Sequence, residues 1–292
     1  MKLNIFASRH SAFYSPLIAS ITAGFLEREG IVASYRVLAP GERSQDLIRE
    51  GVADIIQSAV SSNWKPMEAG DSPLPVHFAQ INQRDGFFLA ARHSDSAFDW
   101  KKLEGRTLLA DHAGQPLAML KYAVHRNGAD WNRIEVVDRG APDKMMDAFR
   151  SGEGDYVHLQ GPGPEILAGE GHSEGAFSVG VDMPAVAFSS LCCSRTFTET
   201  EGYTAFLRGY RKARAWVRMA PASRVAGVLA GEFPGVTVSA LTAAVAHYHA
   251  IGNWDGAIGI GRQHYEQSLT VFQHSGLITA RHPYDSVCVA AE

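Results

Sequence analysis

The chain has 292 residues, of which 46% are hydrophobic and 20% are charged, a composition typical of a folded globular protein long enough for two domains. With 27 basic and 31 acidic residues, a net charge of −4 and no run of Lys or Arg to follow a phosphate backbone, a nucleic-acid partner is not expected. No stretch approaches the roughly 20 apolar residues that span a bilayer, so membrane insertion is not expected either.

The chain opens with a short apolar segment, Leu3 to Ala7, that predicts a β-strand. A polar loop, Ser8 to Tyr14, follows it and leads into a helical pattern in which Ser15 is the expected N-cap and Pro16 the first helical residue. The apolar run before Arg9 is too short for the core of a secretion signal. As it stands, the sequence predicts a cytoplasmic protein, and a periplasmic one if a leader precedes it.

Two segments, one in each half of the chain, repeat one another. DLIREGVADII (46–56) aligns with DAFRSGEGDYV (147–157), with Asp, Arg, Gly and Asp at matching places. In each segment the Gly is expected to end a helix in a left-handed turn, and the Asp three residues later, Asp54 or Asp155, opens the next strand. These two aspartates are therefore expected to be structural and not catalytic.

Each half follows the order strand, polar loop, helix, strand, helix, strand, which is typical of an α/β unit with parallel strands. The expected strands are 3–7, 34–38 and 54–57 in the first half, and 107–110, 134–137 and 155–159 in the second. Apolar, β-rich segments after each half, VHFAQINQRDGFFLAARH and FSVGVDMPAVAFSSLCCS, predict two crossings between lobes. Beyond Thr196, four amphipathic helices are expected to cover the outside of one lobe.

The predicted fold class is therefore α/β, with two Rossmann-like three-layer lobes joined by a two-strand hinge. Lobe 1 is expected to comprise residues 1–88 and 187–292 with the C-terminal helices, and lobe 2 residues 89–186.

The sequence resembles a known family, the type II periplasmic binding proteins of the nitrate, sulfonate and taurine class, which also includes thiamine-pyrimidine-precursor binding proteins and synthases. The resemblance rests on FDWKKLEGRTLLADHAGQPLAMLKYAVHRNGADWNRIEVV (98–137), AFRSGEGDYVHLQGPGPEILAGEG (148–171), the opening strand and helix, and GLITARHPYDSV near the end. It implies a hinged, solute-binding fold over nearly the whole chain. It does not specify the ligand, because family members differ in the loops that contact it.

In open parallel sheets, ligands bind beyond the carboxyl ends of the strands, where helix N-termini present unpaired N–H groups. Two such helix starts facing each other favour a ligand with a negative or strongly polar group, and Phe13 and Tyr14 are expected to offer flat surfaces to it. Arg84 and Asp182 are expected at the cleft mouth, one at each crossing. The candidate ligand-binding residues are Ser8, His10, Phe13, Tyr14, Gln57, Ser58, Ser61, Arg84, His112, Gly114, Gln115, His158, Gln160 and Asp182.

Two interpretations stay open for Arg9, which is either a ligand contact or a solvated loop charge. Three imidazoles, His10, His112 and His158, are expected around one cleft, but no close ligand pair or carboxylate cluster accompanies them. No metal, no cofactor and no catalytic residue is therefore predicted.

The leading functional hypothesis is a solute-binding protein of an ABC importer that closes around a small anionic or heteroaromatic molecule of the sulfonate, aromatic-acid or pyrimidine type. An ABC permease is then a partner. The alternative is a cytosolic enzyme on the same fold, similar to a decarboxylase, desulfinase or pyrimidine synthase, with a cleft histidine as acid or base. The lack of a leader and the adjacent Cys192 and Cys193 favour the enzyme, while the lack of a recognisable nucleophile favours the receptor.

Overall fold

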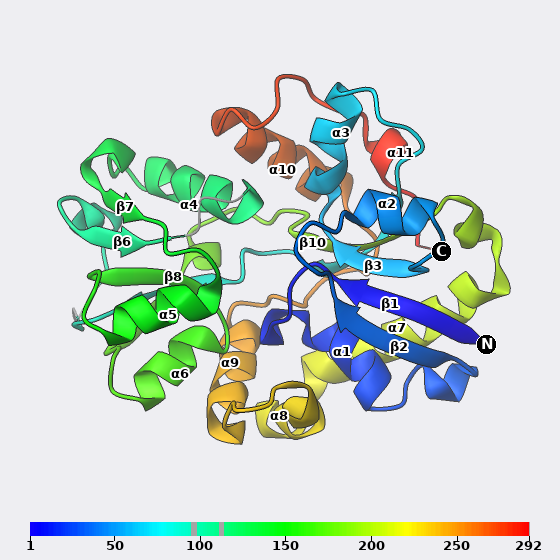
Figure 1. Ribbon diagram of the computed structural model, residues 1–292, viewed down its shortest axis with the longest axis horizontal. Helices are drawn as coiled ribbons and strands as arrows, with labels where there is room; N and C mark the ends of the chain where they lie inside the picture. Colours follow the sequence, from blue (N-terminus) through cyan, green and yellow to red (C-terminus); the bar gives the residue numbers. More distant parts are fainter. Residues whose placement is uncertain (95–97, 111–113, 292) are drawn as a thin grey trace.

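The computed structural model describes residues 1–94, 98–110 and 114–291, and it has two lobes, each built on a five-stranded sheet (Figure 1). The first sheet has the order β2-β1-β3-β10-β4, formed by Val32–Val37, Lys2–Ala7, Ile55–Ser58, Ser189–Cys193 and Val76–Asn82. The second has the order β7-β6-β8-β5-β9, formed by Glu135–Val137, Thr107–Leu109, Tyr156–Gln160, Phe87–Ala91 and Gly175–Ser178. The predicted α/β fold with two similar sheets is confirmed.

The same strand arrangement occurs in both sheets. β1 is parallel to its neighbours β2 and β3, and β6 is parallel to β7 and β8. The fourth strand of each sheet, β10 or β5, is antiparallel to the third. The carboxyl ends of the three parallel strands therefore point in one direction within each lobe, as a binding site at the strand ends requires.

The two aspartates of the repeat have the same structural role. The Asp54 carboxylate accepts the N–H of Asn4 at 2.7 Å, and the Asp155 carboxylate accepts the N–H of Thr107 at 2.9 Å. In both cases the aspartate at the start of one strand binds the neighbouring strand of the sheet. Gly51 and Gly152, which precede them, have φ values of 69° and 99°, the left-handed conformation that glycine adopts most easily.

The chain crosses between the lobes at 83–86 and again at 182–188, between β4 and β5 and between β9 and β10. Because β5 begins at Phe87 and belongs wholly to the second sheet, the first crossing lies slightly before the expected boundary at 88. The two connections meet closely near Gly180, where a Cβ atom would lie 2.2 Å from the carbonyl oxygen of Asp85. Only glycine fits this contact.

Helices cover both faces of each sheet, so each lobe has three layers (Figure 1). In the first lobe, α1, α7 and α8 lie on one side and α2, α3, α10 and α11 on the other, while α4 faces α5 and α6 across the second sheet. Their bounds are α1 Ser15–Thr22, α2 Ser44–Arg49, α3 Trp64–Glu68, α4 Gly114–Arg126, α5 Pro142–Arg150, α6 Gly163–Gly169, α7 Glu201–Met219, α8 Ala222–Leu229, α9 Val238–Ala250, α10 Arg262–His274 and α11 Tyr284–Val287.

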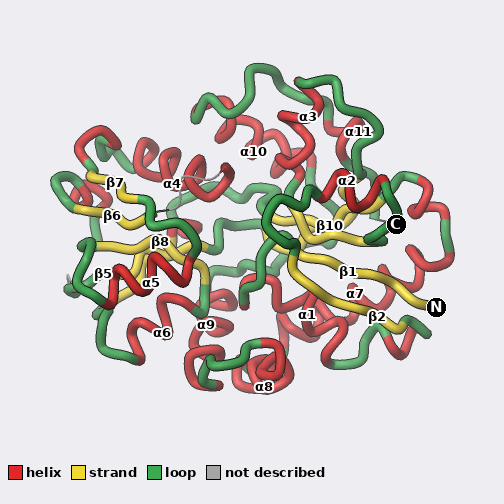
Figure 2. Tube along the Cα trace, in the orientation of Figure 1, coloured by secondary structure: helices red, strands yellow, loops and turns green. Residues whose placement is uncertain are grey.

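The C-terminal helices α9 and α10 pack on the first lobe and also contact the second, so the expectation that all four C-terminal helices cover the outside of one lobe is wrong for these two. Figure 2 shows α9 next to α6 of the second lobe. His247 of α9 contacts Glu165 of α6 at 2.8 Å, and Ser275, just after α10, donates to the carbonyl of Ala118 in α4 at 3.3 Å. The amphipathic pattern indicates which face of a helix is buried, but not which neighbour covers it.

Within the described residues, no helix is long and apolar enough to cross a membrane.

Candidate functional site

Two adjoining cavities lie between the lobes, at the carboxyl ends of β1, β3 and β8. The larger chamber has a volume of about 800 Å³ and is lined from the second lobe mainly by residues of α5, α6 and the end of β8. The smaller chamber has a volume of about 290 Å³ and is lined by the loops after β1 and β3, the start of α4 and the start of β10. Both chambers are lined by Ser8, Arg9, Phe87 and Gln160.

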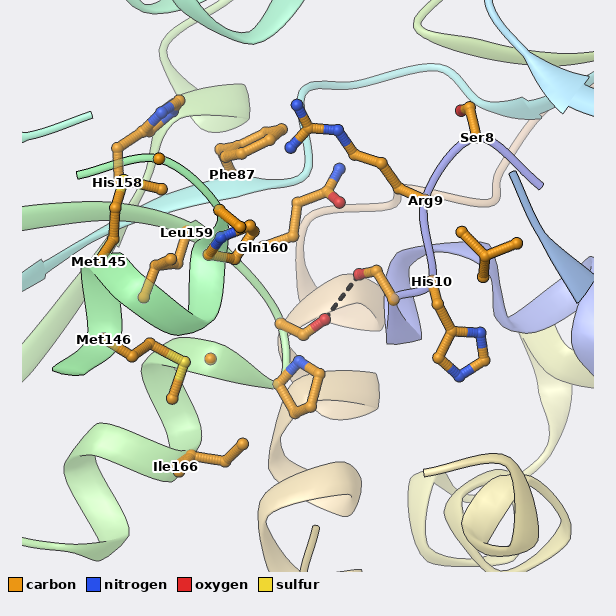
Figure 3. Close-up of a pocket in the computed structure, with 18 of the residues that line it drawn as sticks. Ser8, Arg9, His10, Phe87, Met145, Met146, His158, Leu159, Gln160 and Ile166 are labelled. Carbon is orange, nitrogen blue, oxygen red and sulfur yellow. Dashed lines mark hydrogen bonds between the residues drawn. The ribbon is translucent and has the colours of Figure 1, made fainter. Parts of the chain in front are cut away.

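Arg9 lies where the two chambers meet. Its guanidinium carbon is 6.0 Å from the centre of the Phe87 ring, and Figure 3 shows the side chain extending from the end of β1 toward Phe87 and Gln160. Of the two interpretations left open for Arg9, the one that places it at the cleft agrees with this geometry. A guanidinium at this position presents hydrogen-bond donors suited to a carboxylate, sulfonate or phosphate.

Gln57, at the end of β3, holds the loop that carries Arg9. Its side-chain oxygen accepts hydrogen bonds from the backbone N–H and the hydroxyl of Ser8, both at 3.1 Å. Its amide nitrogen donates to the carbonyl of Ser58 at 3.3 Å. Gln57 lines the smaller chamber as expected, but its amide is also a positioning group for the neighbouring loop.

The start of α1 differs from its predicted form. Ser15 is the first residue of the helix and its hydroxyl donates to Ala12, while Ser11 caps the short turn 12–14 by accepting the N–H of Phe13 at 3.1 Å. The N–H of Ala12 and the Ser11 hydroxyl both donate to the carbonyl of Gly161 in the second lobe, at 3.2 and 2.6 Å. These donors therefore bind the opposite lobe and do not face a ligand.

Phe13 does not offer a surface to a ligand, contrary to the expectation from sequence. It is fully buried, and its ring packs against Phe188 and Tyr248 with centroid distances of 5.3 Å. A Cβ atom on Gly86, at the first crossing, would lie 2.0 Å from the Phe13 ring, so the ring fills the space beside the hinge. Tyr14 does line the smaller chamber, and burial raises the pKa of its phenol.

His10 lines the larger chamber, but protein groups occupy both of its ring nitrogens. Nε2 lies 2.8 Å from the carbonyl oxygen of Glu232, and Nδ1 lies 3.0 Å from the hydroxyl of Tyr35. Because a carbonyl only accepts, Nε2 carries the proton and Nδ1 accepts from Tyr35. Burial lowers the pKa of His10, so the ring is a neutral, fixed part of the wall.

His158 is 1% exposed and stacks on Phe87 at a centroid distance of 4.4 Å. Burial, together with the positive charge of Arg9, lowers its pKa to about 3. It lines the larger chamber as a neutral imidazole. His112, the third predicted imidazole, lies outside the described residues.

Hydrogen bonds join the lobes on both sides of the cleft. On one side, Gly161 donates its N–H to the hydroxyl of Tyr248 in α9 at 2.7 Å, in addition to the two bonds that its carbonyl accepts. On the other side, Gln115 of α4 accepts from Ser61 at 2.6 Å and donates to the carbonyl of Phe188 at 2.8 Å. The lobes are therefore held together around the chambers.

Of the predicted site residues in described positions, most meet at the cleft. The lining of one or both chambers includes Ser8, His10, Tyr14, Gln57, Ser58, Ser61, Gly114, Gln115, His158 and Gln160.

Arg84 and Asp182 line neither chamber. Arg84 donates to the carbonyl of Gly180 at 3.2 Å, which links the two crossings. Asp182 is exposed and accepts the indole N–H of Trp100 at 2.7 Å. The expectation that both lie at the cleft mouth is not supported by this geometry.

The apolar lining of the larger chamber was not anticipated from sequence. Met145 and Met146 of α5 and Ile166 of α6 line it, together with Leu159 of β8 (Figure 3). Adjacent methionines at helical spacing are typical of a helix face packed in a core. Only the structure shows that Met146 and Ile166 are partly exposed at a cavity.

The three cysteines are all buried and line neither chamber. Burial raises the pKa of Cys192 to about 12, and the pKa values of Cys193 and Cys288 are raised as well, so the sulfur atoms are held as unreactive thiols. In the part of the chain that the structure describes, no group of three His, Cys, Asp or Glu side chains is placed to hold a metal ion.

Comparison with known proteins gives a consistent picture of the fold. The sequence profile of the family described as NMT1/THI5 like matches residues 12–223 of the chain. YtlA of Bacillus subtilis, which is named as a binding protein, is 23% identical over an alignment of 291 residues that covers 98% of this chain and 87% of YtlA.

Two solved structures share the whole fold. One is the periplasmic aliphatic sulphonate binding protein SsuA of Escherichia coli, with a TM-score of 0.73 and 15% identity over 97% of this chain and 96% of SsuA. The other is the desulfurization enzyme DszB, with a TM-score of 0.62 and 15% identity over 99% of this chain and 96% of DszB. At such identities the likeness establishes the fold alone, and this fold serves both a receptor and an enzyme.

Proposed function

The chain belongs to the NMT1/THI5-like family, and from that premise we propose that it is the solute-binding protein of an ABC importer, which binds a small organic anion between its lobes. The observation that carries the proposal is the position of Arg9, at the junction of two chambers that residues of both lobes enclose. A ligand bound there contacts both lobes at once only when they are closed. Binding therefore favours the closed state, which is how a hinged receptor signals that it is loaded.

The relatives support a transport role. SsuA of Escherichia coli is a periplasmic binding protein for aliphatic sulphonates, and YtlA is named as a binding protein. We extend this role to the present chain. Its partner is then the permease of the importer, and it acts on the periplasmic side of the membrane. Genes for a permease and an ATPase adjacent to its own gene are the expected genomic context.

The alternative, an enzyme that uses a cleft histidine as acid or base, has less support from the geometry. Both nitrogens of His10 are engaged by Glu232 and Tyr35. Burial keeps His158 neutral, with a pKa of about 3, far from the value near the working pH that acid–base catalysis favours. The sulfur atoms of the cysteines are buried and lie outside the chambers.

The test is a ligand screen by thermal shift and native mass spectrometry with sulfonates, aromatic acids and pyrimidines. A ligand at 100 times its dissociation constant stabilises the protein by about 2.7 kcal/mol, which for a chain of this length raises the melting temperature by several degrees.

The matched variant is Arg9→Gln, which keeps a polar side chain but removes the charge. Loss of hydrogen bonds to a charged group is expected to weaken anion binding by roughly 10- to 100-fold. The melting temperature of the variant without ligand is measured as the control for folding. Turnover of the ligand by the isolated protein would overturn the proposal, as would equal anion affinity in the wild type and the Arg9→Gln variant.

A further inference from the structure

Helix α7 carries a row of three arginines that lines a cavity outside the cleft between the lobes. We propose that this cavity, which Arg211, Arg214 and Arg218 line, is a second binding site and that it takes a phosphate group. None of the residues that line it lines either chamber of the cleft. The proposal is therefore independent of the proposed function and adds a ligand at another place on the molecule.

The cavity lies against the first lobe, between α7 and the loop that follows α9. α7 packs beside α1 in a helix layer of that lobe (Figure 1). The volume of the cavity is about 220 Å³, and its lining is Arg211, Arg214, Ala215, Arg218, Gly256 and Ile258. Since each water in the liquid takes about 30 Å³, the cavity has room for a phosphate group with some of its water.

The spacing of the three arginines puts them on one face of α7. They are three and four residues apart, and side chains at these distances are neighbours on a helix. Arg211 and Arg218 are exposed, so an ion in solution reaches them, whereas Arg214 is only 6% exposed. Three like charges around one cavity repel each other, and a bound anion relieves this repulsion.

Arg214 is held rigidly at the wall of the cavity. Its Nη1 and Nη2 atoms donate to the carbonyl oxygens of Gly256 and Asp255, both at 2.9 Å. Its Nε atom is buried and has no hydrogen-bond partner within residues 1–94, 98–110 and 114–291. A buried charge is costly when no opposite charge accompanies it. An anion in the cavity supplies that charge beside a guanidinium that is already fixed in place.

The other basic residues on the middle of α7 are neutralised within the protein. Arg208 and Lys212 both bind the carboxylate of Glu29, at 2.8 and 2.6 Å. Among the residues that the structure describes, no carboxylate forms an ion pair with the three arginines of the cavity, and Arg211 donates to the carbonyl of Ala291 at 2.9 Å. The charge of this row is therefore available to an anion from outside the chain.

The charges around Arg214 agree with this interpretation. Burial lowers its pKa and the charge of Arg218 lowers it as well, while Tyr210 and Asp255 act in the opposite direction. Asp255 is exposed and does not line the cavity. The side chains that do line it carry positive charge and no negative charge, so the cavity favours an anion.

The number of guanidinium groups favours phosphate over a carboxylate. Each planar guanidinium presents parallel N–H donors that match the oxygens of a phosphate or carboxylate. A phosphate group offers at least three acceptor oxygens and up to two negative charges near neutral pH, whereas a carboxylate offers two oxygens and one charge. Three arginines around one small cavity therefore suit the phosphate group better.

Isothermal titration calorimetry with inorganic phosphate tests the proposal. The full chain carries Arg9→Gln in every sample, so that the arginine of the cleft does not contribute. Arg211→Gln and Arg218→Gln, at exposed positions, are each expected to weaken phosphate binding by about 5- to 10-fold. Arg208→Gln is the matched control, because it removes an exposed cation of the same helix that Glu29 already neutralises.

Three results would overturn the proposal. They are the absence of phosphate binding to the folded protein, equal phosphate affinity with and without Arg211 and Arg218, and an equal loss of affinity in the Arg208→Gln control. The last result would show an effect of net charge and not of this cavity. None of them bears on the Arg9 site, so the proposed function would stand.

A second measurement distinguishes the two sources of a phosphate group, a soluble phosphate compound and a lipid headgroup. Sedimentation with vesicles of phosphatidylcholine, with and without phosphatidylglycerol, is compared with the calorimetry. Binding to the phosphatidylglycerol vesicles that is lost in Arg211→Gln and Arg218→Gln would assign the cavity to a headgroup. Binding of free phosphate without binding to vesicles would assign it to a soluble compound, and binding of neither would overturn the proposal.

Discussion

The two halves of the molecule share a frame and differ in what they present to the cleft. In the frame, Asp54 and Asp155 accept equivalent backbone N–H groups of the neighbouring strand, and both sheets have the same strand order. At the cleft, by contrast, the first lobe supplies Arg9 and several serines, whereas the second supplies two methionines, a leucine and an isoleucine, together with Gln115 and Gln160. The repeated residues thus build the lobes, and the residues that are not repeated line the cleft in which we propose that a ligand binds.

This comparison separates two kinds of effect. A change in the frame is expected to alter the free energy of unfolding without altering ligand affinity. A change in a strand-end loop is expected to alter ligand affinity more than the free energy of unfolding, as Arg9→Gln should show.

Phe149 and Ile48 are at matching positions of the repeat, and both are buried in the core of their lobe. Phe149→Ala is expected to lower the free energy of unfolding by about 3–5 kcal/mol, and Ile48→Ala by about 2–4 kcal/mol, because each leaves a cavity. Urea denaturation measures both changes. The dissociation constant of a bound anion should stay within a factor of about two in each variant, and a large loss of affinity in either would break the separation between frame and site.

The crossings between the lobes are outside the repeat, and there a single methyl group should have a large effect. Gly180→Ala would place its Cβ 2.2 Å from the carbonyl oxygen of Asp85, so the two connections must move apart, at a cost of about 1–3 kcal/mol. We expect a lower melting temperature together with weaker ligand binding, since the crossings set how the lobes close.

The control for the crossing is Gly227→Ala. Gly227 lies in α8 with open space around its Cα, and alanine there is expected to stabilise the protein by up to about 1 kcal/mol. Equal behaviour of the two variants would show that the contact at Gly180 is not tight.

The two aspartates give the most symmetrical test. Asp54→Ala and Asp155→Ala each remove one hydrogen bond that a strand N–H donates to a partly exposed carboxylate. Asp155→Ala also removes an exposed ion pair with Arg106 at 3.7 Å, a kind of contact that contributes little to stability. We expect each to cost about 1 kcal/mol, equal in the two lobes within about 0.5 kcal/mol. Chemical denaturation measures both losses of unfolding free energy. A loss in only one of the two variants would show that the two aspartates do not have the same structural role.

The contact between His247 and Glu165 joins α9 to the second lobe at 2.8 Å. The hydrogen bond with Glu165 raises the pKa of His247 above its usual value, against the effect of burial. Stability from this pair is therefore fully present below about pH 6.5, where the unfolded histidine is also protonated, and it is lost as the pH rises through the raised pKa.

We expect His247→Asn to lower the free energy of unfolding by a few tenths of a kcal/mol to about 1 kcal/mol at pH 6, since the imidazole is half exposed, and by less at pH 8.5. Denaturation of both proteins at the two pH values measures the difference. Buried His77 and His158, with pKa values lowered to about 3, destabilise both proteins alike in acid, so their effect cancels in the comparison. A larger difference at pH 8.5 would contradict the account of this pair.

Much of the frame could be predicted from the sequence. The Gly-x-x-Asp repeat and the apolar runs predict the six parallel strands to within about two residues, and the family resemblance is confirmed. The reason is that turn glycines, strand-opening aspartates and buried strands are local patterns. The fold class follows from their order.

The cleft could be predicted only in part. The strand ends correctly indicate which loops meet, but the direction of a side chain within a loop depends on tertiary contacts. Phe13 therefore points into the core while Arg9 reaches the cleft. Met146 lies on a helix whose sequence pattern is that of a packed face, so nothing local distinguishes a cavity wall from a core.

The most direct test of the account is a crystal structure of the protein with a sulfonate of six or eight carbons. We expect the sulfonate oxygens within hydrogen-bond distance of Arg9 and the alkyl chain within the chambers, so that one molecule contacts both lobes. A ligand bound outside the two chambers, or one that contacts a single lobe, would contradict the account.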